Sequence, residues 1–225
     1  MTREQICAVW TGLSCGIPSA RAAKLYHEYG SFEEIYQNRG QICNPVNFSG
    51  KYAIMAAEEI AAVCDKHGFG ILPYGDMLFP KRLKNIKNPP ALLFYRGDKQ
   101  YFMRLNDMPA LAVVGTRGMT PFGNAIAVKI TGELAAAGIT IISGMALGID
   151  TAAHESALKA GGFTVAVWGG GLLKLFPAEN ARLAEIIADR GLILTEYPPE
   201  THATKFTFPT RNRIVSGLSD GVFIA

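Results

Sequence analysis

LAVVGTRGMTP, residues 111–121, is the stretch of sequence that decides the fold. An apolar run ends in a glycine turn, and a threonine–proline pair then begins a helix. Such a strand–turn–helix junction directs free backbone N–H groups and the positive end of a helix dipole at one point, which favours anions such as phosphate. Arg117 adds a planar guanidinium with a permanent charge. We therefore expect Gly115, Thr116 and Arg117 to form one wall of a phosphate-binding site.

The alternation of a short apolar strand with a helix continues from residue 110 to residue 225. Strands are expected at 111–114, 140–142, 164–167, 192–195 and 222–225, and helices at 121–137, 151–160, 178–190 and 211–218. This alternation predicts an α/β fold, in which right-handed crossovers connect the strands of a parallel sheet.

Ligands of such sheets gather at the carboxyl ends of the strands, and here each of those ends is polar or glycine-rich. Ser143 and Gly144 follow the second strand and precede a helix, so a hydroxyl and amides there are expected to bind phosphate. Gly169 and Gly170 follow the third strand, where they are equally compatible with a tight crossover turn. GxGxxG and GxxxxGK[ST] are absent, which disfavours a nicotinamide dinucleotide and a P-loop.

KFTFPTRNR, residues 205–213, alternates cations with aromatic rings at a second expected helix start. Phe206 is expected to fill the core. Phe208 directly precedes the helix whose first turn holds Arg211, so a ring and a guanidinium are expected to flank one strand of nucleic acid. Stacking on aromatic rings tolerates any base and phosphate contacts supply affinity, so this segment predicts sequence-independent binding of single strands.

The first 70 residues read as short helices, with Pro18 at the start of one, Ser31 in a capping box, and a fourth helix from about Lys51 to Gly68. The sequence Gly16-Ile17-Pro18 is similar to the turn of helix-hairpin-helix or SAM-like modules, although the acidic balance here favours a docking role. We expect a small all-helical domain at 1–75 and an α/β domain at 76–225.

Composition fits a two-part protein whose second part is basic. The chain has 225 residues, 49% of them hydrophobic, and a net charge of +3. Residues 81–225 hold 16 Lys and Arg against 11 Asp and Glu. This excess permits a polyanionic partner, but charge alone also fits an ordinary solvated surface. The four cysteines lie in the first third without metal-ligand spacing, and no segment resembles a signal peptide or a membrane span, so we expect reduced thiols and a cytoplasmic protein.

Four blocks of this sequence resemble consecutive signature blocks of the DprA/Smf family, the DNA-processing proteins of natural transformation. The blocks are VGTRGMTPFG, SGMALGIDTAAHESAL, AVWGGGLLKLFPAENARL, and TEYPPE followed by FPTRNRIVSGLSDGV. The resemblance implies an extended Rossmann-like parallel sheet with helices on both faces, preceded by a SAM-like module. It also implies single-stranded DNA binding in transformation and recombination, protection of incoming strands, and help in loading the RecA recombinase.

The resemblance further assigns roles to individual residues and suggests partners. Arg117 and Lys205 would each hold a backbone phosphate, Phe208 would stack on a base, and Arg211 and Asn212 would shape the pocket. A homodimer is possible, with an interface largely beyond Ala225, because family members continue through a further helix and strand. We expect the C-terminal part of the domain to be missing from this chain.

The rival hypothesis is an enzyme on a related scaffold, similar to the nucleotide phosphoribohydrolases. Those enzymes carry PGGxGTxxE, whereas the three glycines here are followed by Leu-Leu-Lys. Asp150 and His154 share one helix face and could form a metal site or an acid–base pair, but no third ligand has fitting spacing, so we interpret Asp150 as a helix cap. Glu196 is the candidate if hydrolysis occurs. The sequence favours a binding protein without catalytic residues, metal or cofactor.

Overall fold

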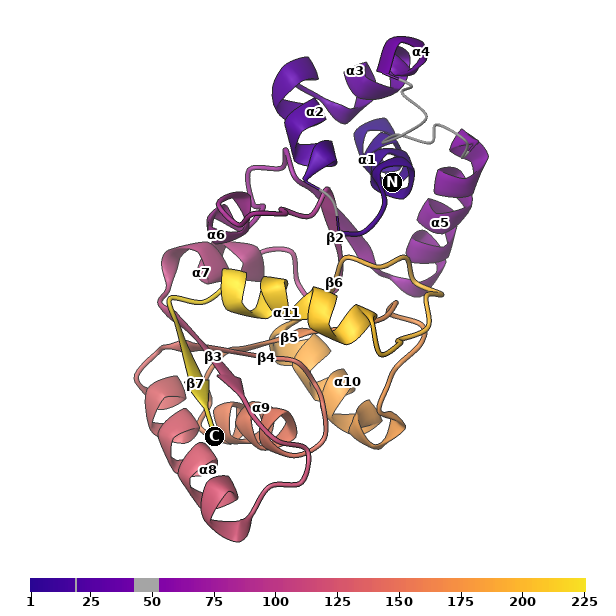
Figure 1. The fold of residues 1–225 in the computed structure, drawn as a ribbon. Coiled ribbons are helices and arrows are strands. Elements are labelled where there is room, and N and C mark those ends of the chain that lie inside the picture. Colours follow the sequence, from indigo (N-terminus) through magenta and orange to yellow (C-terminus); the bar gives the residue numbers. More distant parts are fainter. Residues whose placement is uncertain (19, 43–52) are drawn as a thin grey trace.

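The structure, a computed structural model, describes residues 1–18, 20–42 and 53–225 (Figure 1). Its N-terminal part is a group of short helices whose ends follow the sequence. The Ser31 hydroxyl accepts a hydrogen bond from the Glu34 N–H at 3.1 Å, which confirms Ser31 as an N-cap, while the complete capping box is found at Thr2 and Gln5. Gly30 and Gly68 end helices with φ of 83° and 68°, a left-handed conformation that favours glycine. The helices are α1 (Arg3–Cys15), α2 (Arg21–Tyr29), α3 (Phe32–Gln37), α4 (Arg39–Ile42) and α5 (Ile54–His67).

The described residues form one sheet of seven strands in the order β1-β2-β6-β5-β4-β3-β7. All five predicted strands are present, and they are mutually parallel. Their bounds are β3 (Ala110–Val114), β4 (Thr140–Ser143), β5 (Thr164–Val167), β6 (Leu192–Thr195) and β7 (Gly221–Ile224).

Two further strands make the sheet mixed, which corrects the expectation of a purely parallel sheet. β1 (Gly70–Pro73) pairs with β2 (Leu92–Arg96), and β2 pairs with β6, both antiparallel. The sequence hides them because β1 has only four residues, a glycine and a proline among them, and no helical pattern alternates with either strand. The domain boundary at residue 75 stays a prediction. Strand β1 precedes that boundary but belongs to the sheet of the second domain.

Helices cover both faces of the sheet (Figure 1). From β3 to β6 each new strand is added on the same side of the previous one, so right-handed crossovers place α8, α9 and α10 on one face of the sheet. The chain then returns from β6 to β7, on the other side of β3, and this connection places α11 on the opposite face. The order therefore reverses at β3. The helices are α6 (Lys81–Lys84), α7 (Tyr101–Asp107), α8 (Pro121–Ala136), α9 (Ile149–Lys159), the short 3-10 helix η1 (Ala178–Asn180), α10 (Ala181–Arg190) and α11 (Thr207–Gly217).

Helix α11 begins at Thr207, four residues before the predicted start at Arg211. Thr204 accepts from the Thr207 N–H at 3.3 Å, and Pro209 falls in the first turn, where its missing N–H is not needed. Phe208 therefore lies inside the first turn of α11 and does not precede the helix. This correction fixes the direction of its ring relative to the sheet.

The core joins the two parts of the molecule. One cluster of buried apolar side chains runs from the N-terminal helices, with Trp10 and Phe32, to Leu93 and Phe94 of β2. A second cluster lies between the sheet and helices α8 and α9 and is built mainly from alanines and Ile149. The small side chains of this second cluster let the two helices approach the sheet closely.

Several smaller expectations can be checked in the described ranges. Cys7, Cys15 and Cys64 are free thiols, and burial raises their pKa values to about 11, 12 and 12. Cys43 lies outside the described residues. Lys51, where the fourth helix was expected to begin, lies outside them as well. No helix in those ranges is both long and apolar enough to cross a membrane.

Candidate nucleic-acid interface

A groove of about 470 Å³ opens at the carboxyl end of β3, where the strand order reverses. This is the place at which doubly wound sheets hold their ligands. The groove is lined by the end of β3, the turns after β3 and β4, one side of α11, and Val222 of β7. Its charged lining residues are Arg117, Asp150, Arg211 and Arg213. Cations outnumber acids there, so the groove favours an anion.

Arg117 forms the exposed wall of this groove. Its guanidinium carbon lies 5.5 Å from the centre of the Phe208 ring, within range of a cation–π interaction. Gly115 is required beside it, since a Cβ at that position would lie 2.3 Å from the carbonyl oxygen of Ala225. The Thr116 hydroxyl accepts from the Gly118 N–H at 3.2 Å, so Thr116 shapes the turn. Charge and ring are thus brought together at the rim.

Arg211 forms the floor, with 5% of its surface exposed. One terminal nitrogen donates to the Gly144 carbonyl at 2.5 Å and to the Val167 carbonyl, and Nε donates to Asn212 Oδ1 at 3.1 Å. Burial lowers the pKa of this guanidinium, and Asp150 opposes that effect. Arg211 therefore joins the ends of β4 and β5 and shapes the groove, while Asn212 is exposed beside it.

Arg213, which sequence reasoning missed, also lines the groove. It forms an ion pair with Glu196 at the end of β6, and its Nε and Nη1 are buried without a hydrogen-bond partner in the described residues. Burial raises the pKa of Glu196 to about 7, although Arg213 opposes the shift. No local pattern singles out Arg213, because residues two apart in a helix point to different faces.

Ser143 and the glycines after β5 do not line the groove, contrary to expectation. The Ser143 side chain is fully buried and its hydroxyl donates to the Val113 carbonyl at 2.6 Å, so it links neighbouring strands. Gly169 and Gly170 are buried under the segment that leads to α11. A Cβ at Gly169 would lie 2.9 Å from the Phe208 ring, and one at Gly170 would lie 3.0 Å from the Ala203 nitrogen. These two glycines permit close packing beneath Phe208 and Ala203.

Lys205 and Phe206 lie outside the groove, just before α11. Phe206 is 73% exposed, so the expectation that it fills the core is wrong. The Lys205 ammonium lies 5.1 Å from the centre of the Phe206 ring, and both side chains face solvent. The segment therefore adds a second exposed cation and ring beside the groove.

Asp150 and His154 make structural contacts, although Nε2 of His154 is buried without a hydrogen-bond partner among the described residues. Asp150 is the second residue of α9, and its carboxylate accepts from the Ala146 N–H at 3.2 Å, so it braces the preceding turn and does not cap the helix. His154 is fully buried against the Thr164 hydroxyl at 2.7 Å, and burial, with Arg211 nearby, lowers its pKa to about 3. The residues that the structure describes hold no group of three metal-ligating side chains.

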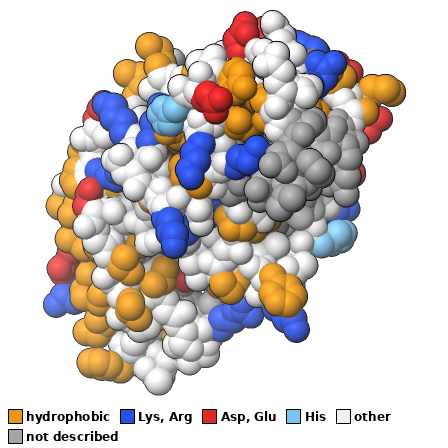
Figure 2. All heavy atoms as spheres, turned by 45° about the horizontal axis from the view of Figure 1, so that its top comes forward, with side chains coloured by type: hydrophobic (Ala, Val, Ile, Leu, Met, Phe, Trp, Pro, Cys, Tyr) orange, Lys and Arg blue, Asp and Glu red, His pale blue; other side chains and the backbone are white. Residues whose placement is uncertain are grey.

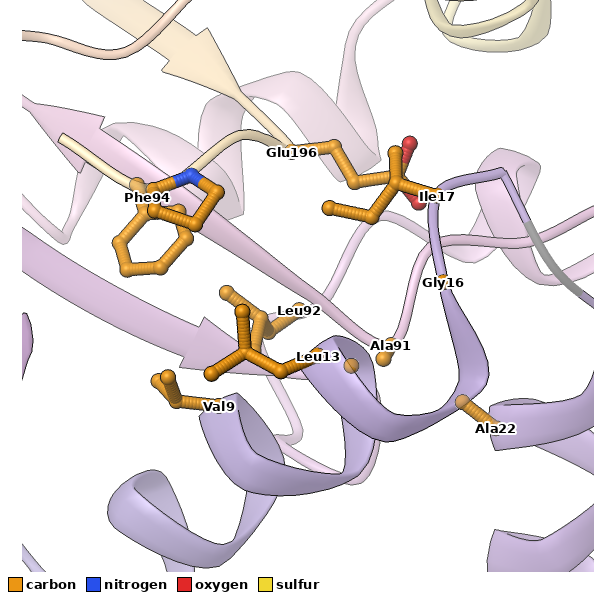
Figure 3. A pocket seen from close by; sticks show the side chains of 11 residues that line it. Val9, Leu13, Gly16, Ile17, Ala22, Ala91, Leu92, Phe94 and Glu196 are labelled. Carbon is orange, nitrogen blue, oxygen red and sulfur yellow. The ribbon is translucent and has the colours of Figure 1, made fainter. Parts of the chain in front are cut away.

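A second, smaller cavity of about 20 Å³ lies between α1, α2 and β2 (Figure 3). Glu196 reaches it from the end of β6, opposite Val9 and Leu13 of α1 (Figure 3). Gly16 and Ile17, from the turn compared above with a helix-hairpin-helix, also line it. That turn therefore packs toward the sheet, which supports a docking role for the N-terminal helices.

Charge on the surface does not by itself locate a ligand. Figure 2 shows Lys and Arg side chains at several separate places on one face and no single continuous basic patch. The groove is distinguished by its combination of cations, a ring and the switch point of the sheet. Fold and site together define a class of protein, a Rossmann-like α/β protein with a basic, aromatic groove at the carboxyl ends of its strands.

Comparison with known proteins gives the family. The family model described as DNA recombination-mediator protein A matches residues 70–225, so the chain belongs to that family. It is 39% identical over 165 residues to DNA processing protein DprA of Bacillus subtilis strain 168, an overlap of 73% of this chain and 54% of that protein. The chain spans between 37% and 62% of the length of three such relatives.

Two solved structures are similar as well. The X-ray structure of DNA processing protein A from Streptococcus pneumoniae matches with a TM-score of 0.76 and 34% identity, over 100% of this chain and 78% of that one. DNA processing protein A from Helicobacter pylori, studied for its single-stranded DNA binding mode, matches with a TM-score of 0.62 and 35% identity, over 69% and 68%. The Rossmann-like fold class is thereby confirmed.

Proposed function

We propose that this chain binds single-stranded DNA without sequence preference through the groove at the end of β3. The observation that carries the proposal is the pairing of Arg117 with Phe208 at 5.5 Å on the groove rim. A guanidinium binds backbone phosphate and a neighbouring ring stacks on a base, so one nucleotide satisfies both. The relative from Helicobacter pylori, described for its single-stranded DNA binding mode, supports this choice of ligand.

The same geometry favours single strands over duplex. Phe208 is half-buried, and its ring rests over Gly169. A base reaches such a ring only when it is unstacked from its neighbours, which costs a duplex additional free energy. Gly115, Gly144 and Asn212 complete the proposed site around Arg211, and Lys205 supplies a phosphate contact next to the groove. Four further residues have an indirect role, because they hold the residues of the site in position: Thr116, Ser143, Gly169 and Gly170.

The wider role follows from family membership. We propose that the chain acts in natural transformation and recombination in the cytoplasm, where it protects incoming strands and helps load the RecA recombinase. A homodimer belongs to the same proposal. The chain acts by binding and not by catalysis. Glu196, the carboxylate that the sequence offered for hydrolysis, does not line the groove and is engaged by Arg213, which disfavours a phosphoribohydrolase-like enzyme.

Fluorescence anisotropy with a labelled oligothymidine, against a duplex of the same length, tests the proposal. At low salt we expect tighter binding of the single strand and a linear loss of log K with log salt concentration. Equal affinity for both DNAs, or no binding by folded protein, would overturn it. A thermal-shift series with nucleoside monophosphates then tests the phosphoribohydrolase hypothesis, which predicts stabilisation by a monophosphate.

A further inference from the structure

Phe176 is an exposed aromatic residue that the site described so far does not use. It lies in the loop between β5 and η1, and 58% of its surface is exposed. Its ring nevertheless has a defined neighbour, the ring of Phe208, at a centroid distance of 6.1 Å and an interplanar angle of 49°. Phe208 lines the groove, so the two neighbouring rings form an apolar patch that extends from it, and such patches mark interaction sites.

The geometry of these two rings restricts how bases could use them. A base held between two rings needs parallel faces about 7 Å apart, two contacts of about 3.5 Å each. The rings of Phe176 and Phe208 are too close and too tilted for that arrangement. Each ring therefore has its own face for a different base, and the two faces are adjacent along one path.

We infer that Phe176 is a second stacking position, which holds the base next to the one on Phe208. This inference rests on the proposed binding of single-stranded DNA and defines how a strand lies on the protein. The Arg117 guanidinium carbon lies 5.5 Å from the centre of the Phe208 ring, and the centre of the Phe176 ring lies 6.1 Å from it. The DNA strand therefore runs from the guanidinium across Phe208 to Phe176. Two bases then share one continuous aromatic surface.

Substitutions at Phe176 combined with a series of oligothymidine lengths test the inference. Phe176→Ala should weaken binding of a long oligonucleotide by about fivefold or more, the lower range for one stacked base. The shortest oligonucleotide that binds should lose nothing, since it does not reach the second ring. Phe176→Leu keeps an apolar contact with Phe208 but has no aromatic face, so it should behave as Phe176→Ala does.

The positive variant is Phe176→Trp, which should keep wild-type affinity and add a fluorescence signal that single strands quench. Trp10 and Trp168 also emit, and Trp168 adjoins Gly169 beneath Phe208, so the change seen with wild type is subtracted from that of Phe176→Trp. Phe122→Ala is the matched control, since this ring on α8 is also exposed, at 77%, and should leave affinity unchanged at all lengths.

The outcomes separate this inference from the proposed function. If wild-type protein fails to bind single strands, the proposed function itself is wrong. If wild type binds and Phe176→Ala is equally tight at every length, the second stacking position is refuted. Equal weakening at all lengths with rescue by Phe176→Leu refutes it too, because Phe176 would then only support Phe208.

Discussion

Arg117 and Arg211 both line the groove, yet their guanidinium groups have opposite surroundings. Arg117 is exposed and faces a ring, while Arg211 is 5% exposed and donates to two backbone carbonyls. A guanidinium whose donors are already satisfied inside the protein holds the fold together, whereas an exposed one is available to a ligand. The exposed side of the groove is therefore expected to bind the ligand, and the buried side is expected to stabilise the fold.

Arg211→Ala gives the largest expected effect and tests the buried side. Its loss leaves the Gly144 and Val167 carbonyls unpaired and Asp150 without a nearby cation. We expect the free energy of unfolding to fall by about 3–5 kcal/mol, as when one partner of a buried charged network is removed. Urea denaturation followed by tryptophan fluorescence measures it, with Arg117→Ala as the control. Normal stability with lost DNA binding would instead make Arg211 a ligand contact.

Arg117→Ala tests the exposed side. Affinity for single strands should fall at least tenfold, because a charge-assisted phosphate contact contributes about 1.5–3 kcal/mol. The slope of log K against log salt should become shallower by roughly 0.7, the value for one phosphate contact on a single strand. Titration at several salt concentrations measures both quantities.

Arg182→Ala on α10 is the matched control for this prediction, since it removes another exposed arginine away from the groove. It should bind normally. Arg117→Ala binding like wild type would show that the exposed guanidinium does not contact phosphate.

Phe208→Ala separates the contribution of the ring to DNA affinity from that of the Arg117 charge on the exposed side of the groove. Affinity should fall by about 1–3 kcal/mol while the salt slope stays unchanged, because removing a ring releases no counterions. A ring that serves only as core would instead show a stability loss of about 3–5 kcal/mol with unchanged binding. Thermal melts beside the DNA titrations distinguish the two outcomes.

Sequence predicted the exposed side of the groove better than the buried side. The glycine turn with Arg117 is a local pattern at a strand end, and the structure places Arg117 at the groove. The alternation of cations and rings is also local, but its helix start was predicted four residues too late, and Phe206 was wrongly expected in the core. Ser143 and Gly169 followed the same local rule but are buried, because β4 and β5 are central strands covered by α11 and its leading segment. Burial depends on the crossover that brings distant residues over the sheet. Local sequence patterns therefore do not predict which strand ends are buried.

The same reason explains Arg213 and Phe176. Arg213 reaches Glu196 only because α11 lies over the end of β6, and Phe176 meets Phe208 only because the loop after β5 approaches the first turn of α11. β1 and β2 were missed for a different reason, since short antiparallel strands without an intervening helix do not show the alternation that predicts a parallel sheet.

The pH dependence of stability examines the buried Glu196–Arg213 pair. Burial raises the folded-state pKa of Glu196 from 4.5 to about 7, so the folded protein binds more protons than the unfolded chain between these values. Stability from this group is therefore lost as pH rises through that window, at up to about 1.4 kcal/mol per pH unit. Glu196→Gln should remove this contribution.

Urea denaturation at about pH 5, 6, 7 and 8, which roughly spans this window, compares the two proteins. The opposite contribution of His154, whose pKa is lowered to about 3, is present in both and cancels in the difference. Parallel stability curves for wild type and Glu196→Gln would show that Glu196 is ionised throughout, held so by Arg213.

Lys205→Ala is the smallest expected effect and marks the outer limit of the exposed side. Its ammonium is solvent-exposed beside Phe206, so a phosphate contact there should contribute only about 0.5–1 kcal/mol. The salt slope should still fall by roughly 0.7, since each lost phosphate contact releases fewer counterions whatever its strength. Together with Arg117→Ala the losses should add to within about 0.5 kcal/mol if the two cations hold separate phosphates. Lys66→Ala on α5 is the control, and a salt slope equal to that of Lys66→Ala would place Lys205 outside the path of the strand.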